Sequence, residues 1–466
     1  MKSVRVSRWG AMLLLGLSLA SAPPAAAKMY DPETFNLANG MQVVVVPNHR
    51  VPIVSHMVWY RVGAADEVPG KSGLAHLLEH LMFKGTPTIA PGEFSKIVAR
   101  NGGRDNAFTS SDYTGYYQNV AADRLELVME MEADRMRNLV LDEQNFRTER
   151  AVVLEERSAR TDNNPGALLA EQMNAALFLN SPYHRPIIGW EKEIAALSLD
   201  DALAYYRRWY APNNAILVVA GDVTAESVRP LAEKYYGKLL PSELPQRLRT
   251  EEPAPRAARR IVLTDGRVQQ PSWSRLYLAP SHGAGETGMV YPLEVLAELL
   301  GGGTTSLLYR SLVVEQGLAA AASASYDSSA VGLTSFRFGA APRPGVPLDK
   351  LEAAIEIQLA KVAKEGFPAA EVERAKDRLQ ASAAYARDSL HTGAYALGEA
   401  LTTGQSVAEV EAWPDRIAAV TAAQVAAAAA MVLESKASVT GLLYPDPKAP
   451  TARKAAPAFT PSKGVH

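Results

Sequence analysis

The chain has 466 residues, a formal net charge of −2 and no cysteine. This length predicts two domains of about 200 residues each. Hydrophobic residues make up 47% of the sequence and charged residues 21%, which is typical of a globular protein and excludes a disordered one. The lack of cysteine excludes thiolate metal ligands and cysteine nucleophiles, and the lack of a long basic block argues against nucleic acid as a partner.

Residues 1–27 have the pattern of a secretory signal peptide. Lysine and arginine residues precede an apolar run at 11–20, and small residues at 25–27 provide a cleavage site. The apolar run is too short to span a bilayer comfortably, and no later segment has the pattern of a transmembrane helix. We therefore expect a periplasmic protein with no membrane partner; the alternatives are an uncleaved anchor or a wrongly assigned start of the sequence.

The first half of the chain is expected to mix short strands and helices. After the turn signal Asn39-Gly40, the runs Met41–Val46 and Val51–Val62 are predicted to pair as a β-hairpin. Apolar residues at helical spacing predict a helix around 74–82. The later elements predicted from the same patterns are a helix at 91–101, paired strands within 106–120, helices at 122–138, 142–160, 165–178 and 199–209, and a buried strand at 215–220.

A proline-rich, charged stretch at 237–258 indicates a link between two domains. The elements predicted beyond it are strands at 260–263 and 272–278, helices at 290–300 and up to about 315, strands at 320–326 and 332–339, helices at 348–364, 369–388 and 418–430, and a strand at 439–443. The similar order in the two halves predicts an α+β fold of two similar domains, each a mostly antiparallel sheet covered by helices. The boundaries we assign are 28–240 for the N-terminal domain, 241–259 for the linker, 260–445 for the C-terminal domain and 446–466 for a disordered tail.

His76 and His80 are candidate metal ligands. Four positions apart on a helix, their imidazoles lie on one face and can bind the same cation. Glu79 is too close to them to be a third ligand, but it is placed to take a proton from a water molecule on the metal. The pattern His-x-x-Glu-His is the inverted form of the better known zinc motif. A helix that holds two histidines by chance is the alternative.

A third ligand is expected from the helix at 142–160. Glu149 and Glu156 are seven positions apart and lie on the same helix face. Glu156 as third ligand leaves the fourth position open for water, as a catalytic zinc requires. Glu149 is predicted to orient a ligand or the water. Glu155 stays open as a rival ligand, and a solvated helix face is the alternative for all three acids.

The segment Gly73–Thr86 resembles the motif of the pitrilysin/insulinase metallopeptidases, a family that includes the mitochondrial processing peptidase and bacterial periplasmic relatives. The segments 149–156, 210–214 and 221–222 are similar to the family as well, and the alignment places its third ligand on Glu156. The four residues that match the family's substrate-binding edge strand are Asn106, Ala107, Phe108 and Thr109.

The resemblance implies a zinc endopeptidase that hydrolyses unfolded peptides, with one Zn2+ per chain and Glu79 as general base. It also implies that the peptide binds as an added strand along 106–109. A clam-like chamber that forms on dimerisation is expected to select substrates by size and shape rather than by sequence.

The chain departs from the family at one place. Many members carry an Arg and a Tyr, seven residues apart, that stabilise the oxyanion; here the matching residues are Val313 and Ala320, which cannot donate such a hydrogen bond. Tyr309, Arg310 or Tyr326 could substitute, or a second related subunit supplies the pair. We favour a heterodimer in which this chain is the catalytic subunit. The alternative is a non-catalytic core or assembly subunit of the same fold.

Overall fold

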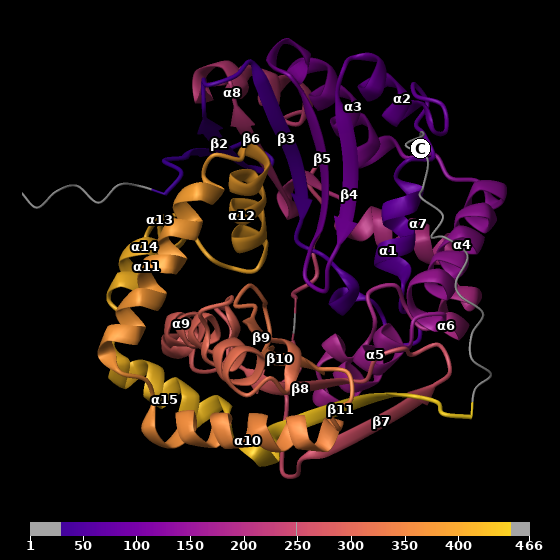
Figure 1. Ribbon diagram of the computed structural model, residues 1–466. Helices are drawn as coiled ribbons and strands as arrows, with labels where there is room; N and C mark the ends of the chain where they lie inside the picture. Colours follow the sequence, from indigo (N-terminus) through magenta and orange to yellow (C-terminus); the bar gives the residue numbers. More distant parts are fainter. Residues whose placement is uncertain (1–28, 248, 449–466) are drawn as a thin grey trace, which may run out of the picture.

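A computed structural model describes residues 29–247 and 249–448. The predicted signal peptide and most of the predicted tail lie outside these residues. The structure has two β-sheets, one in each half of the chain, and each sheet is covered by helices (Figure 1). The α+β class with two similar halves is therefore confirmed.

The first half contains a six-stranded sheet with the order β1-β2-β6-β3-β5-β4. All neighbouring strands are antiparallel except β2 and β6. The strands are β1 (Glu33–Asn36), β2 (Gln42–Pro47), β3 (Ile53–Tyr60), β4 (Arg104–Thr109), β5 (Thr114–Ala121) and β6 (Ala215–Gly221). The helices are α1 (Leu74–Leu81), α2 (Glu93–Arg100), α3 (Leu125–Asn138), α4 (Glu143–Arg157), α5 (Pro165–Leu177), α6 (Glu191–Ala196), α7 (Leu199–Trp209) and α8 (Ala225–Tyr235). Because β4 is the last strand of the sheet, one edge of its backbone pairs with no other strand among the described residues.

The predicted hairpin between 41–46 and 51–62 is wrong. β6 lies between β2 and β3, parallel to the first and antiparallel to the second. The Asn39-Gly40 turn instead joins β2 to β1, a strand that the sequence pattern did not predict. The physical reason is that helices cover both faces of this sheet, so the apolar run of β2 is buried on both faces and belongs in the sheet interior.

The second half contains a five-stranded sheet with the order β7-β11-β8-β10-β9, in which only β7 and β11 are parallel neighbours. The strands are β7 (Arg259–Asp265), β8 (Ser272–Ala279), β9 (Ala319–Tyr326), β10 (Thr334–Pro342) and β11 (Ser438–Pro445). The helices are α9 (Val290–Gly301), a π-helical segment (Tyr309–Glu315), α10 (Leu348–Glu365), α11 (Ala369–Ala386), α12 (Leu390–Thr402), α13 (Val407–Glu411), α14 (Trp413–Ala418) and α15 (Ala422–Val432). Residues 237–258 contain no helix or strand among their described positions; the division of the chain there stays a prediction.

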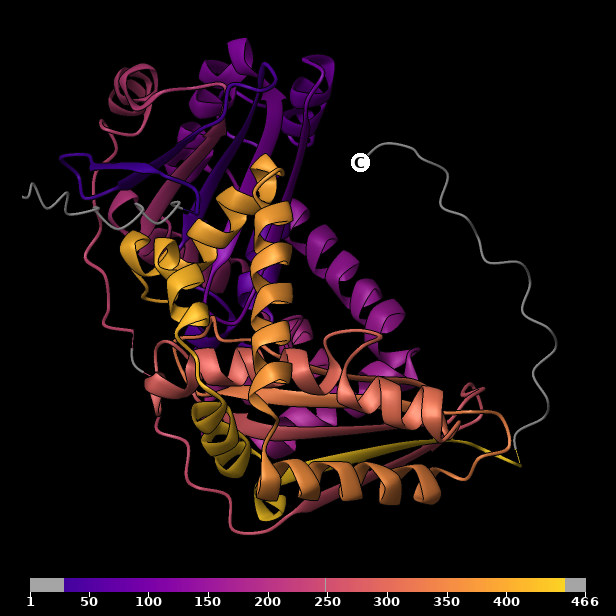
Figure 2. The same ribbon diagram turned by 60° about the vertical axis from the view of Figure 1, so that its left-hand side comes forward.

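One helix from each half of the chain packs against the sheet of the other half. α12 packs on β3 and β6 of the first sheet, and α5 packs on β7 and β11 of the second (Figures 1 and 2). The contacts are close because glycine lies at each: a Cβ on Gly398 would be 2.1 Å from the Trp59 ring, and one on Gly441 would be 2.1 Å from the Met173 sulfur. We therefore expect the two halves to unfold together.

Replacing Gly398 by alanine should destabilise the protein by about 1–3 kcal/mol, because the new methyl group collides with the fully buried Trp59. Thermal and urea denaturation measure the effect. Gly288→Ala is the control, since a Cβ there meets no atom within 4 Å, and it should change stability by less than about 0.5 kcal/mol. If the two substitutions had equal effects, the close packing of α12 on the first sheet would be contradicted.

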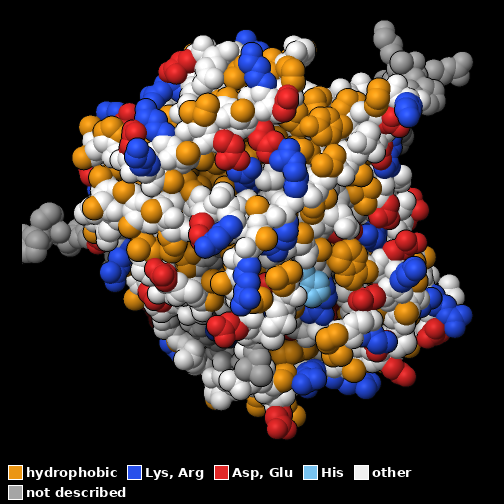
Figure 3. Space-filling view, turned by 90° about the horizontal axis from the view of Figure 1, so that it is seen from below, with side chains coloured by type: hydrophobic (Ala, Val, Ile, Leu, Met, Phe, Trp, Pro, Cys, Tyr) orange, Lys and Arg blue, Asp and Glu red, His pale blue; other side chains and the backbone are white. Residues whose placement is uncertain are grey.

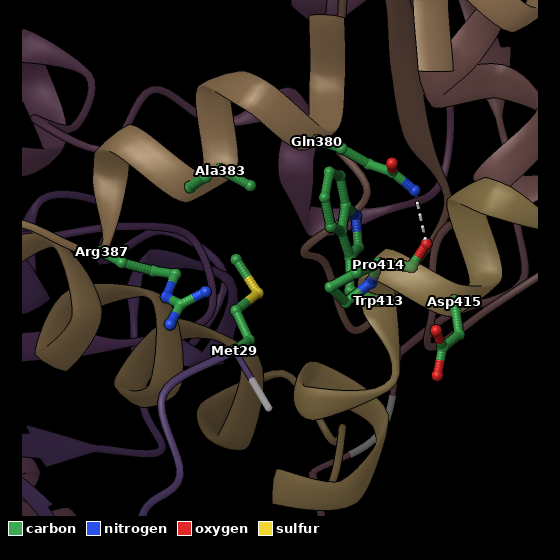
Figure 4. Close-up of a pocket in the computed structure, with 8 residues that line it drawn as sticks. Met29, Gln380, Ala383, Arg387, Trp413, Pro414 and Asp415 are labelled. Atoms are coloured by element: carbon green, nitrogen blue, oxygen red, sulfur yellow. Dashed lines mark hydrogen bonds between the residues drawn. The ribbon is translucent and has the colours of Figure 1, made fainter. Parts of the chain in front are cut away.

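The first described residues lie on the second half of the chain. The Tyr30 backbone N–H donates to Glu411 Oε1 at 2.8 Å. Met29 lines a cavity of about 300 Å³ together with Arg387 and Trp413 (Figure 4). This segment leads directly into β1, so it adds a further connection between the halves.

The surface carries mixed charge. Acidic and basic side chains are interspersed on the face seen from below (Figure 3), as the small net charge of −2 leads one to expect. Among the described residues, no helix combines the length and the apolar character that crossing a membrane requires.

Candidate zinc site

The helix α1 carries the His-x-x-Glu-His motif between the edge strand β4 and the helix α4 (Figure 1). Its leucines at 74, 77, 78 and 81 are buried and fix which face points to the core. Gly73, with φ +87°, precedes the helix, and a Cβ there would lie 2.6 Å from the Ile188 carbonyl oxygen. Only glycine therefore lets α1 begin this close to the loop that contains Ile188.

A buried carboxylate caps the start of α1 from outside the helix. Glu67 Oε1 accepts the Ala75 N–H at 2.8 Å, and the residue is 4% exposed. Burial raises the pKa of Glu67 to about 8, although the backbone N–H groups and Arg185 act against this shift. The helix that carries both histidines is thus held by an acid that stays protonated in the folded protein at neutral pH.

Glu67→Gln should change how stability depends on pH. Folded Glu67 keeps its proton up to about pH 8, whereas glutamate in the unfolded chain loses it near about pH 4.3. Between these values the folded state binds more protons, so the free energy of unfolding falls as pH rises. Urea denaturation between about pH 5 and pH 8, with a chelator present, should show that the substitution removes this decline. If the free energy of unfolding depended on pH in the same way in the wild type and the variant, the raised pKa of Glu67 would be contradicted.

The structure brings His76, His80 and Glu156 together, with one potential ligand atom from each within 4.8 Å of the others. Glu156 Oε2 lies 3.7 Å from His76 Nε2 and 3.4 Å from His80 Nε2. A tetrahedral zinc with bonds of about 2.0–2.1 Å separates its ligand atoms by about 3.4 Å. Glu156 Oε2 is buried and accepts no hydrogen bond from any described residue, so its lone pairs are available to a cation. These three residues therefore fit Zn2+, whereas Glu155 is exposed and lies outside the cluster.

Glu79 lies in the same cavity as this cluster. Its Oε2 accepts a hydrogen bond from Thr109 Oγ1 of β4 at 2.5 Å. Burial raises the pKa of Glu79, and the Thr109 hydrogen bond and His80 counteract the shift. A carboxyl group whose pKa is moved toward neutrality is suited to accept and return a proton near pH 7.

The two imidazoles have opposite electrostatic surroundings. Burial and the neighbouring His80 lower the pKa of His76, which favours the neutral form that binds metal. Burial also lowers the pKa of His80, but the neighbouring carboxylates of Glu149 and Glu156 outweigh it and raise that pKa. His80 Nδ1 lies 3.4 Å from Glu149 Oε2, a distance that is compatible with the predicted role of Glu149 in orienting a ligand.

A cavity of about 690 Å³ contains the cluster. Beside the four motif and cluster residues, it is lined by Asn106, Ala107, Phe108 and Thr109 of β4 and by Arg160, Thr161, Ile187 and Ile188. All of these residues come from the first half of the chain. Among the described residues, Tyr309, Arg310 and Tyr326 do not line this cavity, and the Tyr326 hydroxyl donates to the Pro280 carbonyl at 2.5 Å.

Five residues at or beside the site were not predicted, and one of them is Thr161, which lines the cavity. Lys84 forms an ion pair with Glu149, and Arg160 forms one with Glu156. Each lies four positions after a predicted site residue, His80 or Glu156, a helical spacing that could have indicated contact. Ile187 and Ile188 lie on a loop distant in sequence, where no local pattern marks them.

A helix with His-x-x-Glu-His facing a carboxylate on a second helix is the arrangement of inverted zincins. The family model described as "Insulinase (Peptidase family M16)" matches residues 42–191, and the model "Peptidase M16 inactive domain" matches 196–379. The chain belongs to peptidase family M16, the pitrilysin/insulinase family, which confirms the resemblance found in the sequence.

Several relatives cover most of the chain. The zinc protease PqqE of Helicobacter pylori is 35% identical over 373 residues, which are 78% of this chain and 83% of that protein. An uncharacterized zinc protease of Streptomyces coelicolor is 29% identical and covers 87% of this chain and 88% of its own length. The crystal structure of a protease from Helicobacter pylori has a TM-score of 0.83 at 31% identity, covering 89% of this chain and 99% of that one.

Proposed function

We propose that this chain is a zinc-dependent endopeptidase that hydrolyses unfolded peptides. The observation that carries the proposal is the cluster of His76, His80 and Glu156 with Glu79 in one cavity beside the free edge of β4. Relatives that cover most of the chain are named zinc proteases, which supports the same reaction class.

In this proposal His76, His80 and Glu156 hold one Zn2+, which when bound polarises the scissile carbonyl and makes water more acidic. Glu79 takes the proton of the attacking water and passes it to the leaving amine. Thr109, through its hydrogen bond, holds the Glu79 carboxylate in place between these two transfers.

The peptide is proposed to bind along Asn106–Thr109 by backbone hydrogen bonds, because β4 is an edge strand whose outer side pairs with no strand in the described part of the chain. Backbone pairing favours extended, unfolded chains. It selects weakly by sequence, since side chains of the peptide do not form these bonds. Folded proteins cannot offer such a strand to the cavity.

We further propose that the chain is the catalytic subunit of a heterodimer, whose related partner supplies the Arg/Tyr pair and closes a clam-like chamber. Val313 is buried in the π-helical segment and Ala320 lies on β9, and neither side chain is a donor. The cavity lining comes from the first half alone. We place the heterodimer in the periplasm on the signal-like pattern of residues 1–27.

The test measures zinc content and the hydrolysis of an unfolded, fluorogenic peptide, with and without a related chain that carries the Arg/Tyr pair. We expect one zinc per chain, slow hydrolysis alone and a rate about 10²–10³-fold higher with the partner. A chelator should abolish both rates. If the chain binds no zinc, the peptidase proposal is wrong. If the chain alone hydrolyses the peptide at the full rate, the heterodimer proposal is wrong. Zinc binding with no hydrolysis in either case favours the non-catalytic assembly subunit.

A further inference from the structure

The two oxygens of Glu156 have different partners. Oε1 forms an ion pair with Arg160 Nη1 at 2.5 Å, while Oε2 faces the two histidines and accepts no hydrogen bond. The Glu156 side chain is 15% exposed and the Arg160 side chain is 72% exposed. Arg160 therefore binds the carboxylate from the solvent side and leaves the inner oxygen to the cluster.

Glu149 shows the same division. Its Oε1 forms an ion pair with Lys84 Nζ, while Oε2 lies 3.4 Å from His80 Nδ1. Each carboxylate beside the histidines thus has one oxygen on a cation and the other directed at an imidazole or at the ligand cluster.

The backbone beneath both cations is fixed by hydrogen bonds. The Lys84 N–H donates to the Leu81 carbonyl at 2.9 Å, which extends the last turn of α1. Arg160 lies in a π-helical turn, Ser158–Asp162, that follows α4 and is closed by the Asn163 N–H on the Ser158 carbonyl at 2.9 Å. Arg157 ties the start of this turn to the Gly189 carbonyl at 2.8 Å. π-Helical turns inside helices are frequent at functional sites.

A carboxylate beside a metal can turn about its last side-chain bond and present either oxygen or both. A cation bound to one oxygen removes this freedom, and such outer partners are worth about 10–100-fold in metal affinity. We propose that Lys84 and Arg160 are positioning residues that hold Glu149 and Glu156 with one oxygen each toward the zinc site. This inference rests on the proposed zinc-binding function.

The same helix provides a matched comparison. Arg147 and Glu143 of α4 also form an ion pair, four positions apart, with an Nε–Oε1 distance of 2.7 Å. Arg147 is 66% exposed, close to the 72% of Arg160. Its partner Glu143, however, is 54% exposed and lies outside the cluster. Exposed pairs of this kind contribute about 0–1 kcal/mol to stability. Removal of Arg160 and removal of Arg147 should therefore differ in their effect on zinc binding only because Glu156 faces the histidines and Glu143 does not.

The experiment measures zinc affinity of the full chain by competition with a chromophoric chelator. Arg160→Ala should raise the zinc Kd about tenfold or more, Arg160→Lys should restore part of the loss, and Arg147→Ala should stay within about twofold of wild type. Lys84→Met should weaken zinc binding in the same way as Arg160→Ala. Equal denaturation curves of the chelated proteins would show that folding is intact.

Because Arg160 lines the cavity, contact with the peptide is the competing role. Under that role Arg160→Ala raises KM while zinc affinity stays at the wild-type value, and this result would overturn the inference. Failure of the proposed function itself has a different outcome, since the wild-type chain would then bind no zinc at all. Wild-type zinc binding with a weaker Arg160→Ala site and an unchanged Arg147→Ala site supports the inference.

Discussion

Glu79→Gln is expected to lower kcat for peptide hydrolysis by about 10²–10⁴-fold with one zinc still bound per chain. Glutamine has the shape of glutamate and still accepts the hydrogen bond of Thr109, so the cavity keeps its form. It cannot take a proton from water at neutral pH. The loss should therefore appear in kcat, while KM and the zinc content stay near their wild-type values.

Two further variants distinguish the loss of the general base from changes in the residues around it. Thr109→Val removes only the hydrogen bond to Glu79 and should reduce kcat far less than Glu79→Gln. Glu155→Gln changes an exposed acid beside the cluster and should leave kcat unchanged. Steady-state kinetics and metal analysis on the same samples provide the readings. If the Glu79→Gln enzyme kept full activity, another group would have to carry out the proton transfer, and Glu79 would not be the general base.

The local part of the site could be predicted because helical spacing decides it. The leucines of α1 fix the core face, so His76 and His80 emerge together on the other side. The seven-residue spacing from Glu149 likewise favoured Glu156, and the structure places Glu156 and not Glu155 in the cluster. These inferences needed only neighbours on one helix.

Long-range pairing could not be predicted in the same way. β2 and β3 are separated by β6, a strand that lies more than a hundred residues further along the chain, and no local pattern in either strand announces that insertion. The exchange of α5 and α12 between the halves was missed for the same reason. An apolar helix face shows that it will be buried, but it does not show which sheet will bury it.

A buried ion-pair cluster connects Arg247 and Arg249 of the predicted linker with both halves of the chain, and it fixes the turn beside the edge strand β4. Asp112, in the turn between β4 and β5, is 3% exposed. Its Oδ2 accepts hydrogen bonds from the Tyr183 hydroxyl and from the Val331 N–H, the latter at 3.0 Å and from the β9–β10 turn of the second half. The other carboxylate oxygen binds Arg249 of the linker at 2.7 Å. The turn that ends the proposed peptide-binding strand is therefore anchored to three other segments.

Arg249→Ala should lower the free energy of unfolding by up to about 3–5 kcal/mol, because it removes the cation that lies nearest to the buried carboxylates of Asp66 and Asp112. Urea denaturation measures the loss, and Arg256→Ala, at an exposed linker position, should change stability by less than about 0.5 kcal/mol. Equal losses at the two positions would contradict a buried cluster.

Arg247 should reduce the loss of stability that Arg249→Ala causes. Its Nη2 lies 3.3 Å from Asp66 Oδ2 and 3.5 Å from Asp112 Oδ1, so it can take over part of the charge when Arg249 is removed. The double substitution Arg247→Ala/Arg249→Ala should therefore cost more than the sum of the two single ones. Additive losses would mean that each arginine serves one carboxylate alone, and the linker would then be held by two separate pairs rather than by one shared cluster.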